Sequence, residues 1–225
     1  KAFDIFAEDI NLERSGSNFN CFFKEKPLGR FSLNIPGIHN VLNSLAAIGV
    51  GIELGIGLKK IKTALMNYEG SERRFQIKLE LDDIVVIDDY AHHPTEIQTT
   101  IKVLDNWQKK RLIVVFQPHR FTRTKFLKEE FGRCFKGADL VIVTEIYPAG
   151  EKPISGISAD LIVKELKENG CQNSFFVPKQ ELTSILLDMV KAGDIVLILG
   201  AGDIGRFSNE FSDALKGIKF PLDRL

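Results

Sequence analysis

The sequence is poor in cysteine and has no surplus charge of either sign. Its three cysteines, Cys21, Cys134 and Cys171, lie far apart and form no Cys-x-x-Cys pair. This usage is typical of reduced thiols in the cytoplasm and argues against a disulfide framework or a zinc site. The 30 basic and 30 acidic side chains cancel, whereas a protein that coats a polyanion needs many surplus Lys and Arg. We therefore expect a cytoplasmic protein that does not bind nucleic acid.

Long hydrophobic runs are missing as well. The longest, at residues 112–116 and 195–199, have the length of strands, whereas a helix needs about 20 apolar residues to span a bilayer. The sequence begins KAFDIFAED, with acids where a signal peptide would be apolar. We therefore expect no membrane insertion. Because the chain enters a strand-like segment directly and without an initial Met, we also expect a fragment of a longer protein.

Two motifs that would fix an enzyme class are absent. There is no GxxxxGK[ST] loop for nucleotide phosphates, since the lysines after Gly55 and Gly57 have the wrong spacing and no Ser or Thr for Mg²⁺ follows. There is no GxSxG elbow for a serine nucleophile either. The chain by itself therefore lacks a phosphate cradle.

The apolar residues that are present divide the chain into two regions. Up to about residue 35, apolar and polar residues alternate in short bursts, which predicts antiparallel strands joined by turns. From Asn40 the apolar residues follow a helical period, residues 58–67 predict a second helix, and residues 68–71 have the composition of a linker. We therefore predict two domains, or parts of domains, in residues 1–71 and 72–225.

Strand and helix patterns alternate strictly in the second region. Amphipathic helices are predicted to begin near Pro94, Thr122, Ser158, Lys179 and Ile204, where Pro94 suits a first turn and Ser158 an N-cap. Continuous apolar runs lie before and between them, at residues 84–87, 112–116, 140–143, 174–177 and 195–199. Such runs indicate parallel strands covered on both faces. The predicted fold is α/β, doubly wound, with a mostly parallel, Rossmann-like sheet.

Ligands of such sheets bind at the carboxyl ends of the strands. The loop after residues 84–87 reads DDYAHHP and contains Asp89, Tyr90, His92 and His93. A carboxylate can accept ribose hydroxyls, and a histidine can donate to phosphate or carboxylate oxygens; helix capping by Asp89 or His93 is the alternative. So many polar groups exceed what a cap needs, which favours a functional loop. A metal site is disfavoured, because adjacent side chains of an extended segment point in opposite directions.

The loop after residues 112–116 contains His119, Arg120 and Arg123 and opens a helix. The arginines are three residues apart and can share one face of the first turn, where guanidinium groups and helix amides would bind a carboxylate or phosphate. The alternative is a solvated basic face. Residues 106–128 contain bases and no acid, whereas acids predominate in residues 80–105. The neutral total therefore conceals a polarised charge distribution.

The GAGDIG sequence at residues 200–205 matches GxGxxG, but the helix after it nearly ends the chain and leaves no strand for a ribose-binding acid. We therefore favour a tight turn beside a site over a NAD pocket.

The roles of two pairs of polar residues stay open. Asn40 and Asn43 lie one helical turn apart and suit an adenine edge, although Asn40 can equally cap a helix. Arg73 and Arg74 form either a phosphate clamp or a solvated pair.

Together these motifs resemble the Mur ligase family, the ATP-dependent amide ligases of peptidoglycan precursor synthesis. The resemblance covers the chain from about residue 30 and includes IPGIHNVLNSLAA, ERRF and VIDDYAHHPTE. HHPTE, FQPHRFTRT, EIYPAGE and GAGDIG fit the member that joins L-alanine to UDP-N-acetylmuramate, although Ala91 stands where that member more often has Gly.

The resemblance implies a fold and a reaction. Residues 1–71 would be the carboxy-terminal part of the central ATP-binding domain and residues 72–225 the carboxy-terminal ligase domain. The chain would be inactive alone, because the P-loop and the UDP-sugar domain are missing. In the family, ATP phosphorylates the muramoyl carboxylate and the amine of L-alanine attacks the acyl phosphate. The implied cofactors are ATP and Mg²⁺, with the metal ligands mostly outside this chain.

The same resemblance implies site residues. Those implied to contact ATP are His39, Asn40, Asn43, Arg74 and Asp89. Those implied to hold alanine and the acyl-phosphate end of the sugar nucleotide are Tyr90, His92, His119, Arg120 and Arg123, of which the histidines and arginines form the catalytic set. No metal ligand is implied.

Other functions compete with this one. A ligase of the same family that recycles muropeptides by adding a tripeptide has similar motifs, but HRFTRT fits the alanine enzyme better. An NAD(P)-linked oxidoreductase could use GAGDIG, and a non-catalytic module could bind a nucleotide or amino acid on the same kind of sheet.

Overall fold

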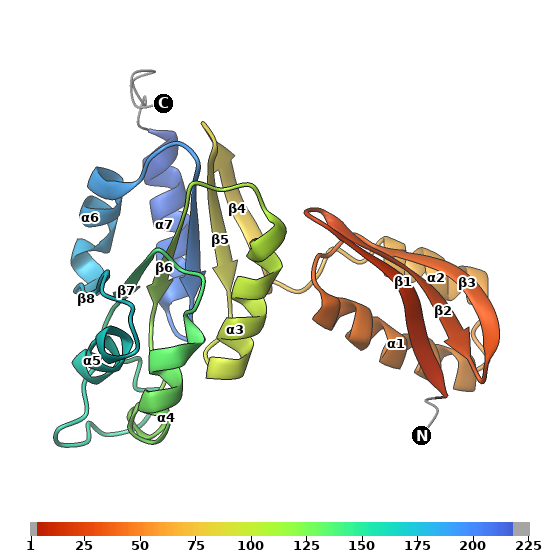
Figure 1. The fold of residues 1–225 in the computed structure, drawn as a ribbon, viewed down its shortest axis with the longest axis horizontal. Coiled ribbons are helices and arrows are strands. Elements are labelled where there is room, and N and C mark those ends of the chain that lie inside the picture. The colour runs from red at the N-terminus through yellow and green to blue at the C-terminus, as the bar shows by residue number, and fades with distance from the viewer. Residues whose placement is uncertain (1–3, 218–225) are drawn as a thin grey trace. The chain divides into compact units, whose positions relative to one another are not determined.

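The chain divides into two compact units, residues 1–71 and residues 72–225, which we call the amino-terminal and carboxy-terminal units (Figure 1). The computed structural model describes residues 4–217, apart from the side chain of Asn106. The boundary follows residues 68–71, the segment with the composition of a linker. None of the helices in the described residues has the length and apolar character that a membrane span requires.

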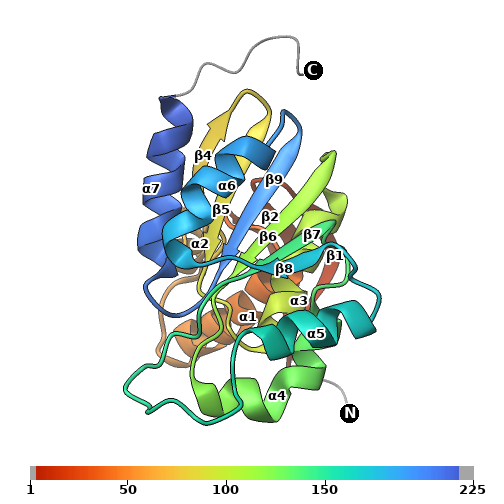
Figure 2. The same cartoon turned by 90° about the vertical axis from the view of Figure 1, so that its left-hand side faces the viewer.

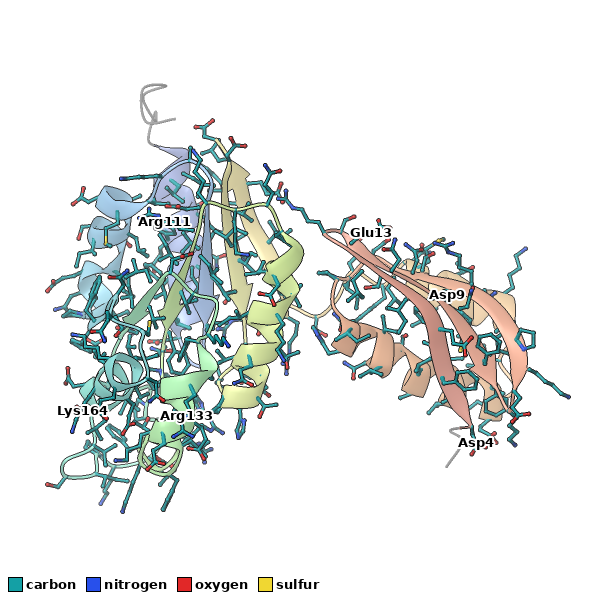
Figure 3. All side chains as sticks on the ribbon, viewed as in Figure 1. Asp4, Asp9, Glu13, Arg111, Arg133 and Lys164 are labelled. Atoms are coloured by element: carbon teal, nitrogen blue, oxygen red, sulfur yellow. The ribbon has the colours of Figure 1, made fainter. Side chains whose placement is uncertain are left out.

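The amino-terminal unit is built on a three-stranded sheet. Its elements are β1 (Ile5–Glu13), β2 (Gly16–Phe23), β3 (Lys26–Leu33), α1 (Ile38–Glu53) and α2 (Leu58–Met66). The strands are antiparallel in the order β1-β2-β3, as predicted, and α1 and α2 pack on them. Phe19, Phe31 and Ile48 are buried between sheet and helices. Side-chain hydrogen bonds join the strands. For example, Asn20 Nδ2 of β2 donates to Asp9 Oδ2 of β1 at 2.8 Å, and Asp9 is labelled in Figure 3.

The carboxy-terminal unit is built on a six-stranded sheet. Its elements are β4 (Gln76–Leu81), β5 (Ile84–Asp89), α3 (Pro94–Val103), β6 (Arg111–Phe116), α4 (Phe121–Cys134), β7 (Leu140–Val143), α5 (Asp160–Glu168), β8 (Ser174–Phe176), α6 (Leu182–Met189), β9 (Asp194–Leu199) and α7 (Ile204–Lys216), with 3₁₀ turns at Leu104–Asn106 and Lys179–Glu181. The order is β4-β5-β9-β6-β7-β8, with β4 antiparallel to β5 and the other pairs parallel. Helices α3, α4 and α5 cover one face, and α6 and α7 the other (Figure 2). The predicted doubly wound α/β fold is confirmed.

The sequence does not predict β4, which forms a hairpin with β5 at the edge of the sheet. Asp82 and Asp83 both have positive φ, 48° and 60°, which is the geometry of a tight two-residue turn. β4 is polar at every second position, and its register shifts between Ile77 and Leu79. It therefore lacks the continuous apolar run that marks the central strands.

Most helices begin within three residues of their predicted starts. α3 and α7 begin at Pro94 and Ile204, as predicted. Ser158 is not the N-cap of α5, which follows Ala159; its hydroxyl bonds to the Asp160 carboxylate at 3.1 Å. That prediction was wrong because the hydroxyl meets a neighbouring acid rather than a helix amide.

An ion pair joins two adjacent strands at their amino ends. Arg111 of β6, labelled in Figure 3, donates from Nε to Asp194 Oδ1 of β9 at 2.9 Å and from Nη2 to Oδ2. Asp194 is buried, and a bidentate pair of this kind adds directional as well as electrostatic stabilisation. It fixes the register of the two strands whose opposite ends carry the loops described next.

Candidate active site

The candidate site lies in loops at the carboxyl edge of the larger sheet. These loops follow β5, β6, β7 and β9, which run parallel and therefore end at one edge. Tyr90 and His92 follow β5, and His119 follows β6. The structure brings these three predicted residues together and adds Tyr147, which follows β7.

The rings of these residues form a row, which we call the ring row. Tyr90 meets His92 edge-on with ring centroids 5.5 Å apart, His92 lies 5.4 Å from His119, and His119 stacks on Tyr147 at 5.6 Å. The backbone of residues 118–120 exchanges two 2.8 Å hydrogen bonds with Tyr147. Sequence reasoning missed Tyr147, although its place in a strand-end loop was a usable signal.

The two arginines after β6 have different surroundings. Arg123 Nη1 lies 3.1 Å from His119 Nδ1 and donates to the His119 carbonyl at 3.3 Å. Arg120 is exposed and precedes α4 with a φ of 75°, so the two do not share a helical turn as expected. Partial burial and the neighbouring His92, Arg123 and Arg120 lower the pKa of His119. The His119 imidazole is therefore held neutral beside two guanidinium groups.

The amino end of α4 is capped by an acid from another loop. Glu151 accepts hydrogen bonds from Thr122 Oγ1 at 2.6 Å and from Thr122 N at 3.0 Å, and these bonds lower its pKa. A helix amide that the sequence analysis assigned to a substrate anion is thus satisfied by the protein. The Thr122 amide is therefore already paired within the protein.

Asp89 is buried at the end of β5, with 5% of its surface exposed. Its oxygens accept hydrogen bonds from Phe75 N at 2.8 Å and Ala91 N at 2.7 Å. Burial raises its pKa to about 6, although these bonds and Arg74 act in the opposite direction. Asp89 does not cap α3; it ties the loop after β5 to the segment before β4.

His93 and Glu96 form the cap of α3. His93 Nδ1 accepts from Thr95 N at 3.3 Å, and Glu96 Oε2 accepts from the backbone N of His93 at 3.2 Å and of His92 at 3.1 Å. This reciprocal pair is a capping box, so for His93 the capping alternative holds. Glu96 Oε2 also lies 3.5 Å from His92 Nδ1, a contact that sequence reasoning missed.

Arg73 and Arg74 separate in the structure. Arg73 Nε donates to Asp88 Oδ2 at 3.1 Å, and its other nitrogens donate to the carbonyls of Gly200 and Gly202. Arg74 is exposed, with its guanidinium 5.5 Å from the Tyr90 ring. Arg73, whose guanidinium also lies 5.3 Å from the Tyr90 ring, therefore fastens the glycine-rich turn, and Arg74 is the more exposed of the two cations beside the ring row.

Side chains of the chain itself fill the glycine-rich turn after β9. A Cβ on Gly202 would lie 2.4 Å from Gln117 Oε1 and 2.5 Å from Tyr147 Cγ, and one on Gly205 would lie 2.4 Å from Arg73 Nε. The glycines make room for these side chains rather than for a pyrophosphate. The motif is therefore a tight turn that borders the site.

A cavity of about 610 Å³ adjoins the ring row at Tyr147. Its lining includes Gln117, Lys179 and Asp203. Asp203 binds Lys179 Nζ and accepts from Gln117 Nε2 at 2.7 Å. These bonds help to lower the pKa of Asp203 and keep its charge paired.

The residues implied for adenine lie on α1 of the amino-terminal unit. α1 starts after Gly37, and Asn40 Nδ2 donates to the Pro36 carbonyl at 2.7 Å. Asn40 is thus not the N-cap; its side chain braces the turn before the helix. His39 and Asn40 are half-buried, whereas Asn43 is exposed.

Metal ligands and reactive thiols are not features of the part of the chain that the structure describes. Within residues 4–217, no group of three His, Cys, Asp or Glu side chains is arranged to hold a metal ion. Burial raises the pKa of the Cys21 thiol to about 11 and also raises that of Cys134.

A family model described as Mur ligase, glutamate ligase domain, matches residues 73–202. The chain belongs to the Mur ligase family. The match includes β4 to β9 and the four strand-end loops, and it confirms the resemblance inferred from the motifs.

Curated Mur ligases are similar to nearly the whole chain. Proteins named UDP-N-acetylmuramate--L-alanine ligase from Geotalea daltonii and Geobacter sulfurreducens are both 44% identical to it, over 95% and 92% of the chain. These matches cover 47% and 46% of the relatives. The chain therefore spans about half the length of the curated Mur ligases that it matches.

Solved Mur ligases share the fold. UDP-N-acetylmuramate-alanine ligase from Thermotoga maritima superposes with a TM-score of 0.83 at 30% identity, over 97% of this chain and 47% of that one. A murein peptide ligase from Psychrobacter arcticus gives a TM-score of 0.68 at 24% identity, over 97% and 45%, which shows the fold alone. Because the 44% identical relatives bear the name of the alanine ligase, the recycling ligase and the NAD(P)-binding or regulatory module are not favoured.

Proposed function

We propose that this chain is the carboxy-terminal portion of an ATP-dependent ligase that joins L-alanine to UDP-N-acetylmuramate through an acyl phosphate. The observation that carries the proposal is the ring row, in which Tyr90, His92 and His119 from two loops meet beside Arg123. The relatives that bear this enzyme's name support the choice of substrates. Residues 1–71 belong, in this proposal, to the central ATP-binding domain, and residues 72–225 form the ligase domain.

The charges around the ring row suit the proposed reaction. The alanine carboxylate and the acyl phosphate are both anionic, and arginine binds such groups through two parallel hydrogen bonds. Arg123 is fixed against His119. Arg120 is exposed, and its side chain makes no capping hydrogen bond to α4. Positive charge fixed before the reaction stabilises the charge that develops in the transition state. We assign Arg120 and Arg123 to this task and Tyr90 to the wall of the alanine site.

Nucleotide binding is proposed for residues of both units. Asn40, Asn43 and His39 would face adenine, Arg74 the phosphates and Asp89 the ribose, since Arg74 is exposed and Asp89 keeps carboxylate lone pairs beyond its two backbone bonds. ATP with Mg²⁺ supplies the phosphoryl group that activates the muramoyl carboxylate. Because this chain contains no P-loop, we propose that it is inactive alone.

Arg120→Ala in the full-length enzyme tests the assignment. We expect amide formation from L-alanine, UDP-N-acetylmuramate and ATP to slow by about tens-fold or more, because a charge aimed at the transition state is lost. Phosphate release dependent on all three substrates is the measurement. Lys125→Ala is the matched control, because it removes an exposed cation from α4, the helix that Arg120 precedes. Unchanged turnover of the Arg120 variant at saturating alanine would contradict the role.

The competing functions are tested with the same proteins. Faster turnover with the tripeptide than with L-alanine would identify the recycling ligase. Titration of this chain with nicotinamide dinucleotide, followed by the fluorescence of buried Trp107, should give no saturable change. A saturable change would favour the oxidoreductase.

A further inference from the structure

Glu96 contacts the Nδ1 side of the His92 ring. A substrate would use the other ring nitrogen, Nε2. Its Oε2 lies 3.5 Å from His92 Nδ1 and also accepts the backbone N–H groups of His92 and His93. A capping box needs an acceptor oxygen at this position, which Gln provides as well as Glu. The negative charge of Glu96 is therefore not required for the cap, and it faces His92.

Hydrogen bonds fix the tautomers of the two histidines in the ring row. His92 Nδ1 lies 2.9 Å from the Tyr90 carbonyl, which only accepts, so Nδ1 carries the proton and Nε2 a lone pair. His119 Nδ1 lies 3.1 Å from Arg123 Nη1, which only donates, so Nδ1 accepts and Nε2 carries the proton. His92 thus offers a proton acceptor, and neighbouring His119 offers a donor.

The two histidines have oppositely charged neighbours, a carboxylate beside His92 and a guanidinium group beside His119. Glu96 faces His92 from α3, and His119 lies beside it from the loop after β6. Arg73 and Arg74, from the segment before β4, lie over the neighbouring Tyr90 ring, and Arg74 also acts on Glu96. Arg120, Arg123 and Glu151 surround His119. Although partial burial acts against it, the backbone N–H and the ring of His92 lower the pKa of Glu96, so Glu96 stays ionised. His119 is crowded by the arginines, whereas His92 has a carboxylate next to its Nδ1 proton.

We propose that His92 accepts the proton that the ammonium group of the incoming amino acid must lose, with Glu96 as the positioning residue that orients His92 and stabilises its protonated form. This inference rests on the proposed ligase function. One N–H bond of the ammonium breaks and a bond to His92 Nε2 forms, and the electron pair stays on the amine nitrogen. That pair then forms the C–N bond as the C–O bond to phosphate breaks. The phosphate leaves with the electrons of that bond and takes the second proton of the nitrogen, so that the products are a neutral amide, hydrogen phosphate and protonated His92, which returns its proton to water.

Glu96→Gln in the full-length enzyme tests the positioning role, because Gln keeps the cap and removes the charge. We expect kcat to fall and the acidic limb of the kcat/KM profile to move to lower pH, since protonated His92 loses its stabilising carboxylate. His92→Gln should lower kcat about 100-fold. Glu129→Gln, an exposed acid on α4, should change neither value. An acidic limb that stays in place in Glu96→Gln would overturn the proposal, because loss of a cap alone does not move it.

Hydroxylamine and nitrogen NMR separate this inference from the proposed function. Hydroxylamine is uncharged at neutral pH and reaches the acyl phosphate with its electron pair free, so it does not need the first proton transfer to His92. Hydroxamate formation should therefore survive in both variants; equal losses with both nucleophiles would overturn the role of His92. In the 225-residue chain, NMR should show the neutral ring of His92 protonated on Nδ1, the nitrogen 2.9 Å from the Tyr90 carbonyl. The opposite tautomer would overturn the proposal. Failure of the wild type to use L-alanine would instead refute the ligase function.

Discussion

The two units of the chain differ in how completely they bury their apolar surface. The sheet of the carboxy-terminal unit is covered on both faces, and its central strands β5, β6 and β9 are buried along almost their whole length. The sheet of the amino-terminal unit has helices on one face, and β1 is half-buried or exposed throughout. One unit is therefore closed around its core, whereas the other is covered on one side.

The outer face of α1 sharpens this contrast. Ile38, Leu42 and Val50 have exposed fractions of 42%, 57% and 60%, and Leu54, the residue after α1, has one of 72%. At 3.6 residues per turn, Ile38, Leu42 and Val50 lie within about 120° of the helix circumference and therefore form one stripe. A surface helix normally presents polar residues there, and a contiguous exposed apolar stripe marks a surface that another structure covers. This stripe supports the proposal that residues 1–71 are part of a larger domain.

The difference between the two units indicates which of them can hold a site with fixed geometry. The ring row and its arginines sit on loops of the closed unit, whose paired strand ends hold each loop in place. A site positioned by rigid elements keeps its geometry better than one on a partly covered element. The partly covered unit contributes only residues assigned to the adenine end.

The largest effect is expected from a pair of matched substitutions, one in the core of each unit. Phe116→Ala and Phe31→Ala each remove a buried ring, 0% and 2% exposed, and each should cost about 3–5 kcal/mol of its own unit's free energy of unfolding. We expect Phe31→Ala to unfold the amino-terminal unit and leave the other folded. Urea titration with Trp107 fluorescence for the carboxy-terminal unit, alongside circular dichroism, is the measurement. One shared transition that both variants shift equally would break the comparison.

Hydrogen exchange measures the same contrast without mutation. The amides of β5, β6 and β9 should exchange about 100-fold or more slowly than those of β1 to β3, because local opening is easier where fewer apolar groups are buried. Mass spectrometry of exchanged peptides resolves the two sets. Equal protection in both units would show that the one-sided core is sufficient.

Much of this organisation is predictable from the sequence, because it depends on local patterns. Apolar runs such as residues 195–199 mark buried parallel strands, and Pro94 and Ile204 mark helix starts that the structure confirms. The polar strand β4 was not predictable in this way, since its pairing with β5 depends on two Asp residues in a strained turn.

Contacts within the site depend on distant parts of the chain and were harder to predict. The loops that carry Tyr90, His92 and His119 were identifiable from their place after strands, but the stacking of Tyr147 on His119 requires the pairing of β6 with β7. Likewise, the capping of α4 by Glu151 joins residues 29 positions apart. No short-range signal separates that acid from others in its loop.

The buried Asp89 makes the stability of the closed unit depend on pH. Its folded-state pKa is raised to about 6 by burial, above the usual value of about 3.9 in an unfolded chain. Its stabilising effect is therefore full below about pH 3.9 and lost as the pH rises through about 6. Between pH 4 and 7, the free energy of unfolding of wild type relative to Asp89→Asn should fall by about 2 to 3 kcal/mol. A pH-independent difference in urea titrations would contradict the assigned pKa.

The smallest effect is expected on the apolar stripe of α1. Leu42 is 57% exposed, so Leu42→Gln should change the unfolding of this chain by less than about 0.5 kcal/mol. In the full-length protein the same change should be more costly, because the proposal places Leu42 under the rest of its domain and a buried amide without partners is destabilising. Lys59→Gln on α2, also exposed, is the control in both proteins. Equal, small effects of Leu42→Gln in this chain and in the full-length protein would show that nothing covers the stripe. The amino-terminal unit would then be covered on one side only in the full-length protein as well.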